Sequence, residues 1–149
     1  FDQVAALVGG MVRRSEHPDG SSRPVDGQEC FLLDTMGELG KAYALADVAI
    51  VGRSFLGLYG SDMIEPIALG KPTIVGPHHS DFSHVMEALV AGQGVVVTDR
   101  PGQVAAELLA DRARAARLAS SGRSVILSRQ GATACHVEMI NRLLNGRTT

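Results

Sequence analysis

The chain has 149 residues and a net charge of −2, without the strong basic excess of a general nucleic-acid-binding protein. Hydrophobic residues make up 45% of the chain, so it can bury a core and is not expected to be disordered. No stretch approaches the roughly 20 apolar residues that a membrane-spanning helix needs. These values predict one soluble domain, residues 1–149, with no nucleic-acid partner.

The order of apolar and turn-forming residues predicts helices alternating with strands. Apolar residues at helical spacing or helix-start signals mark residues 1–8, 34–46, 62–70 and 82–91, and Pro101 opens a further helix. Strand patterns cover residues 11–13, 29–33, 47–51, 72–75 and 94–98. From residue 111 to residue 144 the pattern is helical, with expected breaks near Gly122 and Gly131. Residues 14–28, rich in Ser, Pro, Gly and charge, are expected to form a mobile surface loop.

Strands that alternate with helices over short links are typical of a parallel sheet with helices on both faces, a Rossmann-like α/β fold. Ligands of such sheets bind at the carboxyl ends of the strands. The loops that follow Leu33, Val51 and Val75 are therefore expected at one edge of the sheet.

Residues 60–78 contain the strongest candidate site. A short helix is expected from about Asp62, with Glu65 in its first turn. Free N–H groups at a helix start attract anions, and a carboxylate accepts hydrogen bonds from sugar hydroxyls. Phosphate beside ribose is the combination that a nucleotide sugar presents. The alternative is that Asp62 and Glu65 form a capping pair of structural value only.

Two further loops have the composition of a binding site. Thr35, Met36, Gly37 and Glu38 have the spacing of a capping box, and Gly37 would also let a ligand approach the backbone closely. The loop that begins at residue 52 supplies spare amides and the cation of Arg53, which either meets a phosphate or is solvated.

The histidines of the chain do not predict a metal site. His78, His79 and His84 match no zinc-binding spacing, and we expect neither a metal nor a cofactor. His78 is expected to line a polar site, whereas His79 is expected at the surface.

These segments resemble the 3-deoxy-D-manno-octulosonic acid (Kdo) transferases, glycosyltransferases built from two Rossmann-like domains in the GT-B arrangement. The resemblance covers nearly the whole chain from Asp34, and residues 34–144 support it best. The matching residues are Asp34-Thr35-Met36-Gly37-Glu38-Leu39, Tyr43, Ala46-Asp47-Val48-Ala49-Ile50-Val51-Gly52, Ser54, Glu65, Gly76-Pro77-His78, Phe82 and Gly131-Ala132. The family usually has His-Asn where this chain has Ser61-Asp62, and a second Gly where it has Arg53.

The resemblance implies a function in lipopolysaccharide biosynthesis. It implies that the chain is a C-terminal domain that binds the donor CMP-Kdo, whose Kdo is transferred to a lipid A precursor. Carried over by position, the residues implied to line the nucleotide are Met36, Gly37, Glu38, Asp62, Met63, Ile64 and Glu65. Further phosphate or sugar contacts are implied for Arg53, Ser54, Gly60, Ser61 and His78.

The resemblance also implies a larger enzyme. In the family the acceptor and the catalytic base belong to an N-terminal domain, and the parent enzyme works at the cytoplasmic face of the bacterial inner membrane. We therefore expect this chain to be a soluble fragment that lacks the first strands of its domain and is inactive alone. Two alternatives stay open, which are the donor domain of a GT-B transferase or epimerase that uses a UDP-sugar, and a non-catalytic α/β binding module.

Overall fold

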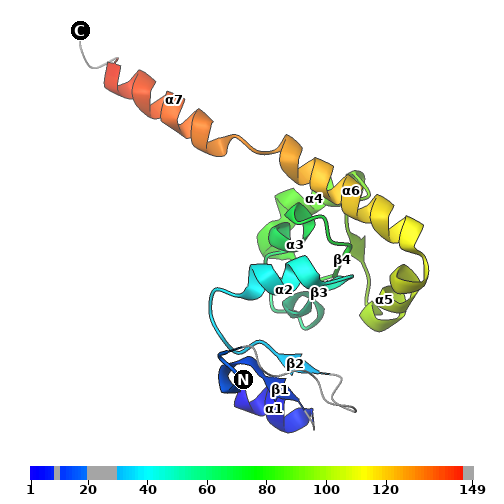
Figure 1. Cartoon of the computed structure of the whole chain (residues 1–149). Coiled ribbons are helices and arrows are strands. Elements are labelled where there is room, and N and C mark those ends of the chain that lie inside the picture. Colours follow the sequence, from blue (N-terminus) through cyan, green and yellow to red (C-terminus); the bar gives the residue numbers. More distant parts are fainter. Residues whose placement is uncertain (9–10, 20–29, 146–149) are drawn as a thin grey trace. The chain divides into compact units, whose positions relative to one another are not determined.

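The computed structural model describes residues 1–8, 11–19 and 30–145 (Figure 1). The chain divides into two compact units, Phe1–Leu45 and Ala46–Thr149, and each is described by itself. Of the expected surface loop 14–28, residues 14–16 form a short 3-10 helix, whereas residues 20–28 lie outside the described residues.

The first unit pairs two short parallel strands. Its elements are α1 (Asp2–Leu7), β1 (Val12–Arg13), the 3-10 helix η1 (Arg14–Glu16), β2 (Phe31–Leu32) and α2 (Leu39–Leu45). In the pairing of β1 with β2, Val12 lies opposite Phe31 and Arg13 opposite Leu32. The strands expected at 11–13 and 29–33 are therefore present.

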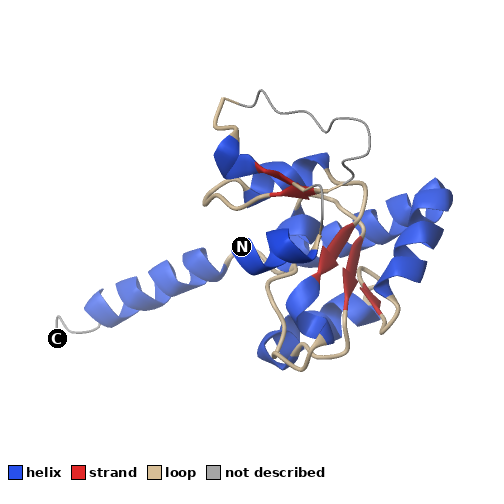
Figure 2. Cartoon of the chain, turned by 90° about the horizontal axis from the view of Figure 1, so that it is seen from below, coloured by secondary structure: helices blue, strands red, loops and turns tan. Residues whose placement is uncertain are grey.

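The second unit contains a three-stranded parallel sheet in the order β3-β4-β5 (Figure 2). Its elements are β3 (Ala49–Val51), η2 (Gly52–Phe55), α3 (Ile64–Ala68), β4 (Thr73–Val75), η3 (Ser80–Phe82), α4 (Ser83–Ala91), β5 (Val96–Val97), α5 (Pro101–Ala110), α6 (Arg112–Ser128) and α7 (Ala132–Asn145). Ile50 lies opposite Ile74, and Ile74 opposite Val96.

Helices cover both faces of this sheet, as the α/β fold class predicts. On one face Val51 and Val75 pack with apolar side chains of α3, α4 and α6, among them Ile67, Leu89 and Ile126. On the other face the side chain of Ile74 packs with Leu108 of α5 and Ala115 of α6. All three residues of β4 are buried, because neighbouring residues of a strand point to opposite faces and both faces are covered here.

The strands within the described residues form two sheets and not a single one. The described strands form one two-stranded and one three-stranded sheet, and the former lies in the first unit. The expectation that the loops after Leu33, Val51 and Val75 share one edge is therefore confirmed only for Val51 and Val75, whose strands are hydrogen-bonded neighbours.

Helix α6 runs through Gly122 without the break that the sequence pattern led us to expect. A Cβ atom on Gly122 would collide with the backbone of Gly94, and one on Gly94 would collide with Gly122. Gly122 is therefore needed for close packing of α6 on the segment before β5, not for ending a helix. The expected break at Gly131 is confirmed, since Gly131 has φ +118° and separates α6 from α7.

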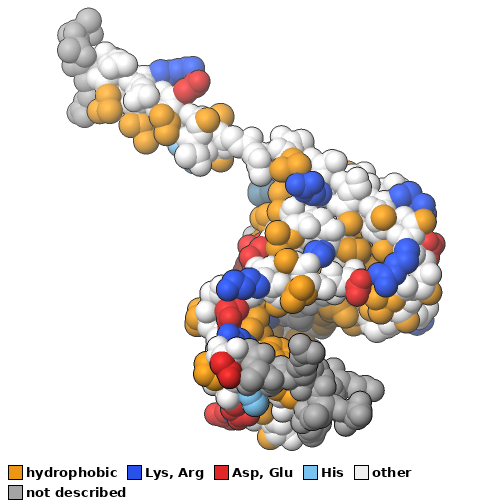
Figure 3. Space-filling view, viewed as in Figure 1, with side chains coloured by type: hydrophobic (Ala, Val, Ile, Leu, Met, Phe, Trp, Pro, Cys, Tyr) orange, Lys and Arg blue, Asp and Glu red, His pale blue; other side chains and the backbone are white. Residues whose placement is uncertain are grey.

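Helix α7 is exposed along its whole length. It buries no residue, and its hydrophobic side chains reach the surface (Figure 3). They are Val137, Met139, Ile140, Leu143 and Leu144. In the part of the chain that the structure describes, no helix combines the length and the apolar character needed to cross a membrane.

Candidate functional site

Ser54 joins the loops that follow β3 and β4. Its hydroxyl group is fully buried, donates to the carbonyl of Val51 and accepts from the amide of Gly76, with an N···O distance of 2.7 Å. The carbonyl of Ser54 accepts from the amide of His78 at 2.9 Å. The expected contact between Ser54 and a ligand is not supported, because the hydroxyl is enclosed by backbone; Ser54 instead fixes the two loops to each other.

Gly76 has no room for a side chain. A Cβ atom at this position would collide with the carbonyl group of Ser54 and with the Phe55 ring. The loop after β4 can therefore lie directly against the loop after β3. This contact places the Gly-Pro-His segment, which the sequence marks as a candidate, at the carboxyl edge of the sheet.

A cavity of about 360 Å³ opens between the two loops at this edge. The residues that line it come from the loop after β3, the loop after β4 and the start of α4; they are Gly57, Tyr59, Pro77, His78, His79, Ser80 and Ser83. His78 therefore lines a cavity, as expected. His79 also lines it, so the prediction that His79 is a simple surface residue is wrong.

Left-handed backbone conformations occur in this cavity wall and beside it. Gly57 of the lining has φ +67°, and Gly60, next to the lining residue Tyr59, has φ +101°. A Cβ atom on Gly60 would lie 3.1 Å from the Cα of His79. Tyr59 has φ +65°, a conformation that is uncommon for a bulky residue. The Tyr59 carbonyl accepts from the amide of Asp81 at 3.2 Å, which ties this residue to η3. The loops are thus held together at several points.

Helix α3 is shorter than predicted and its start is already occupied. It has five residues, Ile64–Ala68, and the Asp62 carboxylate accepts from the Ile64 amide at 2.7 Å. This amide is not free for a phosphate, and Pro66 has no N–H group, so the anion site expected at the helix start stays a prediction. Met63 is fully buried in the core, which leaves its side chain no access to a ligand.

Glu65 and Arg53 have side chains that are available for ligands. Glu65 lies in the first turn of α3 and Arg53 lies in η2, and both are exposed. Neither side chain has a hydrogen-bond or ion-pair partner among the described residues. Ser61 is half-buried and Ile64 packs at the edge of the core. The Glu65 carboxylate in α3 and the Arg53 cation in η2 both belong to the segment that connects β3 to β4. A carboxylate is suited to bind hydroxyl groups, and a cation is suited to bind an anion.

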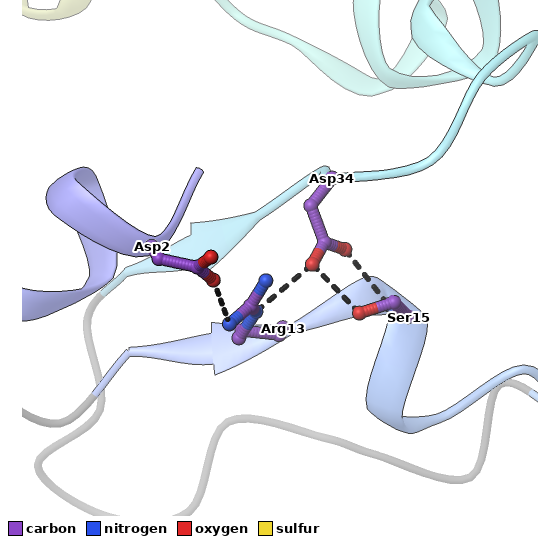
Figure 4. Close-up of polar contacts among 4 residues, drawn as sticks. All are labelled: Asp2, Arg13, Ser15 and Asp34. Carbon is purple, nitrogen blue, oxygen red and sulfur yellow. Dashed lines mark hydrogen bonds and ion pairs between the residues drawn. The ribbon is translucent and has the colours of Figure 1, made fainter.

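In the first unit, a polar network holds the loop that follows β2. The Arg13 guanidinium contacts Asp34 at 2.9 Å and Asp2 at 2.8 Å, while Ser15 donates to Asp34 from its amide and its hydroxyl (Figure 4). Only 2% of the Asp34 side chain is exposed. Hydrogen bonds from the Ser15 hydroxyl and amide and from Arg13 lower the pKa of Asp34 to about 2. The carboxylate is therefore ionised and fixes the loop start.

Glu38, a predicted nucleotide contact, is held at the other end of this loop. Its carboxylate accepts from the Thr35 hydroxyl and pairs with Arg14 at 3.1 Å, and these two contacts lower its pKa. The predicted capping box is wrong, because the helix begins at Leu39 and Thr35 bonds the Glu38 side chain, not a backbone amide. Met36, in contrast, is 94% exposed.

Gly37 lies between Met36 and Glu38 with φ +81° and open space around it. A ligand can therefore approach its backbone, as the sequence suggested. Met36, Gly37 and Glu38 belong to the first unit and Asp62–Glu65 to the second, so their ligand roles stay predictions.

Several residues with a place in these sites were not predicted from the sequence. The loop after β2 is held by Arg13, Arg14 and Ser15. The two adjacent arginines were the available signal for this role in the sequence. Tyr59 gave no signal, because only the backbone conformation distinguishes it. Among the described residues no group of three His, Cys, Asp or Glu side chains could hold a metal ion.

Relatives of this chain share its sequence over most of its length. It is 37% identical over 137 residues to 3-deoxy-D-manno-octulosonic acid transferase of Bordetella pertussis, a match that covers 89% of this chain and 32% of that enzyme. It is 32% identical over 126 residues to the enzyme of the same name from Haemophilus influenzae, covering 82% of this chain and 29% of that enzyme. No protein-family model matches the chain.

The fold is also found in a solved structure. The C-terminal CMP-Kdo binding domain of WaaA from Acinetobacter baumannii superposes with a TM-score of 0.75 at 24% identity, covering 84% of this chain and 65% of that one. The chain thus has the Rossmann-like α/β fold of a GT-B C-terminal domain. It is a homologue of the Kdo transferases, as its motifs indicated, and spans about a third of the length of these relatives.

Proposed function

We propose that this chain is the donor-binding part of a Kdo transferase that takes Kdo from CMP-Kdo and transfers it to a lipid A precursor. The observation that carries the proposal is the 37% identity over 137 residues to the Bordetella pertussis enzyme. The fold of the CMP-Kdo binding domain from Acinetobacter baumannii supports the same ligand. The acceptor is bound by another domain, and the parent enzyme acts at the cytoplasmic face of the bacterial inner membrane.

The exposed side chains of the second unit supply the polar contacts of this proposal. The Glu65 carboxylate accepts hydrogen bonds from the ribose hydroxyls, since it is exposed and has no partner of its own. Arg53 neutralises the single phosphate of CMP, since its guanidinium is exposed, whereas the Ile64 amide at the start of α3 is already bound by Asp62.

The reaction is a displacement at the anomeric carbon of Kdo. A lipid hydroxyl group attacks this carbon, the bond to the phosphate oxygen breaks, and CMP leaves with the bonding electrons. The proton of the hydroxyl group goes to a base on the acceptor-binding domain. The role of Arg53 is to stabilise the negative charge that develops on the leaving phosphate.

Calorimetric titration of the full-length protein with CMP and with UDP tests the proposal. We expect CMP to bind at least tenfold more tightly than UDP, and Glu65→Gln to weaken CMP binding about tenfold, because hydrogen bonds to a charged group are lost. Glu87→Gln, at an exposed glutamate of α4, is the matched control and should leave the affinity unchanged.

The alternatives give different results in the same titration. Tighter binding of UDP would support a donor domain for a UDP-sugar and contradict the proposal. Binding of neither nucleotide would favour a non-catalytic module. A loss of affinity in Glu87→Gln equal to that in Glu65→Gln would remove the assigned role of Glu65.

A further inference from the structure

A second cavity, of about 430 Å³, lies between α6 and the segment that precedes β5. The polar residues that line this α6 cavity are Gln93, Arg114, Arg117, Ser120 and Ser121, and among the described residues no Asp or Glu lines it. Because Gln93 precedes β5, the α6 cavity lies at the amino edge of the parallel sheet, whereas the loops after β3 and β4 lie at the carboxyl edge. It shares no residue with the contacts assigned above to CMP.

The walls of the α6 cavity are held by backbone packing. Helix α6 approaches the segment before β5 so closely that a Cβ atom on Gly94 would collide with Gly122. The amide of Gly94 donates to the carbonyl of Leu89 at 2.7 Å, and the amide of Gln93 donates to the carbonyl of Val90 at 3.1 Å, which closes the end of α4. The backbone on both sides is therefore fixed, and the cavity exists before any ligand binds.

Several hydrogen-bond donors around this cavity have no partner among the described residues. They are the guanidinium of Arg117, the side-chain amide of Gln93 and the hydroxyl groups of Ser120 and Ser121. A serine within a helix can donate to the carbonyl four residues earlier, but neither serine does so here. Arg114 pairs with Glu107 at 3.0 Å and keeps further N–H groups, since a guanidinium has five. The cavity thus offers donors from two segments to one ligand.

Helix α6 is also basic. It contains four arginines and no Asp or Glu, and basic side chains lie over the α6 region in Figure 3. Three of these arginines donate to a carboxylate or a carbonyl group of the protein. Among the described residues Arg117 has no such partner, so its charge is available at the cavity.

From these observations we propose that the α6 cavity binds a phosphate group. Arg117 supplies the positive charge, and Ser120, Ser121 and Gln93 donate to the phosphate oxygens. Phosphate accepts several hydrogen bonds at once, and a guanidinium binds it with two parallel N–H groups. The phosphate belongs to a small soluble ligand or to the headgroup of an anionic lipid, and the experiment separates these two sources. The proposal does not rest on the proposed function, because it uses no residue assigned to CMP.

Inorganic phosphate is the probe for a soluble ligand, and its ³¹P relaxation reports binding to the full-length protein. We expect a dissociation constant of about 1–10 mM, weakened about threefold to tenfold in Arg117→Ala. Arg129→Ala is the matched control, because it removes the same charge from an exposed arginine that does not line the cavity. Saturating CMP should leave the bound phosphate in place. Displacement of phosphate by CMP would show that it occupies the nucleotide site and would overturn the proposal.

Gln93→Gly separates a ligand contact from a structural role. Gln93 has φ +52°, at a position after a helix end where Gly is usual, so this variant should not lower the melting temperature. Loss of the side-chain amide should nevertheless weaken phosphate binding about twofold to fivefold.

Co-sedimentation with vesicles tests the lipid headgroup. The full-length protein is mixed with vesicles of phosphatidylcholine alone or with added phosphatidylglycerol. If the site takes a headgroup, Arg117→Ala should lower binding to the anionic vesicles about fivefold, and Arg129→Ala should lower it less than twofold. Equal effects of the two substitutions on both probes, or no effect of Arg117→Ala and Gln93→Gly on either probe, would show that this face of α6 is only a solvated basic surface and would overturn the proposal.

Discussion

The hydroxyl group of Ser54 accepts a hydrogen bond from the amide of Gly76 at 2.7 Å, in a place where neither atom reaches solvent. This contact joins the loops after two neighbouring parallel strands, and Gly76 has no space for a Cβ atom beside Ser54. The candidate cavity lies between these loops. Its shape therefore depends on a buried serine that does not contact the ligand.

Replacing Ser54 with Ala should destabilise the second unit. The Gly76 amide would be left buried without an acceptor, and we expect a loss of about 1–3 kcal/mol in the free energy of unfolding, measured by urea denaturation. Ser128→Ala is a matched control, because Ser128 also donates to the carbonyl three residues earlier, but at an exposed position. An effect of Ser128→Ala as large as that of Ser54→Ala would contradict the role assigned to burial.

Two glycines within helices should respond to alanine in opposite ways. Gly122→Ala is expected to destabilise the protein by more than about 1 kcal/mol, since the new methyl group would collide with the Gly94 backbone. Gly102→Ala, in the first turn of α5 with nothing within 4 Å, should stabilise it by about 0.5–1 kcal/mol. Thermal unfolding of both variants measures the difference. Stabilisation by Gly122→Ala would show that α6 does not pack as described.

Asp34 should titrate at unusually low pH. Its pKa is lowered from 3.8 to about 2 in the folded chain, so the ionised form stabilises the first unit. This contribution is complete above about pH 4 and is lost as the pH falls through about 2. An NMR titration that follows the Asp34 carboxyl carbon measures the pKa directly. Ser15→Ala should raise it, because the Ser15 hydroxyl is the largest cause of the shift.

The Asp47 carboxylate, whose pKa is lowered by its hydrogen bond with Arg112, provides the reference in the same NMR titration. The pKa of Asp47 should not respond to Ser15→Ala, because its partner is Arg112 and not Ser15. An Asp34 pKa near 4 in the wild-type protein would contradict the network of Figure 4.

Arg53→Ala should weaken CMP binding, and the loss should shrink as salt is raised, because the contact is between exposed charges. We expect a loss of about threefold to tenfold at low ionic strength. Arg129→Ala, at another exposed arginine of the same unit, is the control. A loss that does not depend on salt would speak against a direct contact with phosphate.

The sequence predicted the elements of the fold well because the signals are local. The apolar run at residues 48–51 and the Pro-Thr-Ile-Val run at 72–75 both contain strands of the parallel sheet, although Ile50 in β3 is 47% exposed. Gly122 misled the prediction, since a glycine required by packing on Gly94 has the same local appearance as a glycine that ends a helix. Such a contact between distant residues leaves no trace in the spacing along the chain.

The candidate site was predicted only in part for the same reason. The free Glu65 and the Gly-Pro-His loop follow from their positions after buried strands. That Asp62 would occupy the Ile64 amide, or that Ser54 would be enclosed by backbone, depends on side-chain geometry that the sequence does not contain. The same holds for Tyr59, whose left-handed conformation is a property of the folded loop.

The most direct test of the account is a transfer assay with the full-length protein, CMP-Kdo and a lipid A precursor. The account predicts release of CMP together with a lipid product whose mass has increased by one or more Kdo residues, and a marked decrease of both in Glu65→Gln. Transfer from a UDP-sugar in place of CMP-Kdo, or a protein that binds CMP-Kdo without releasing CMP in the presence of the acceptor, would contradict it.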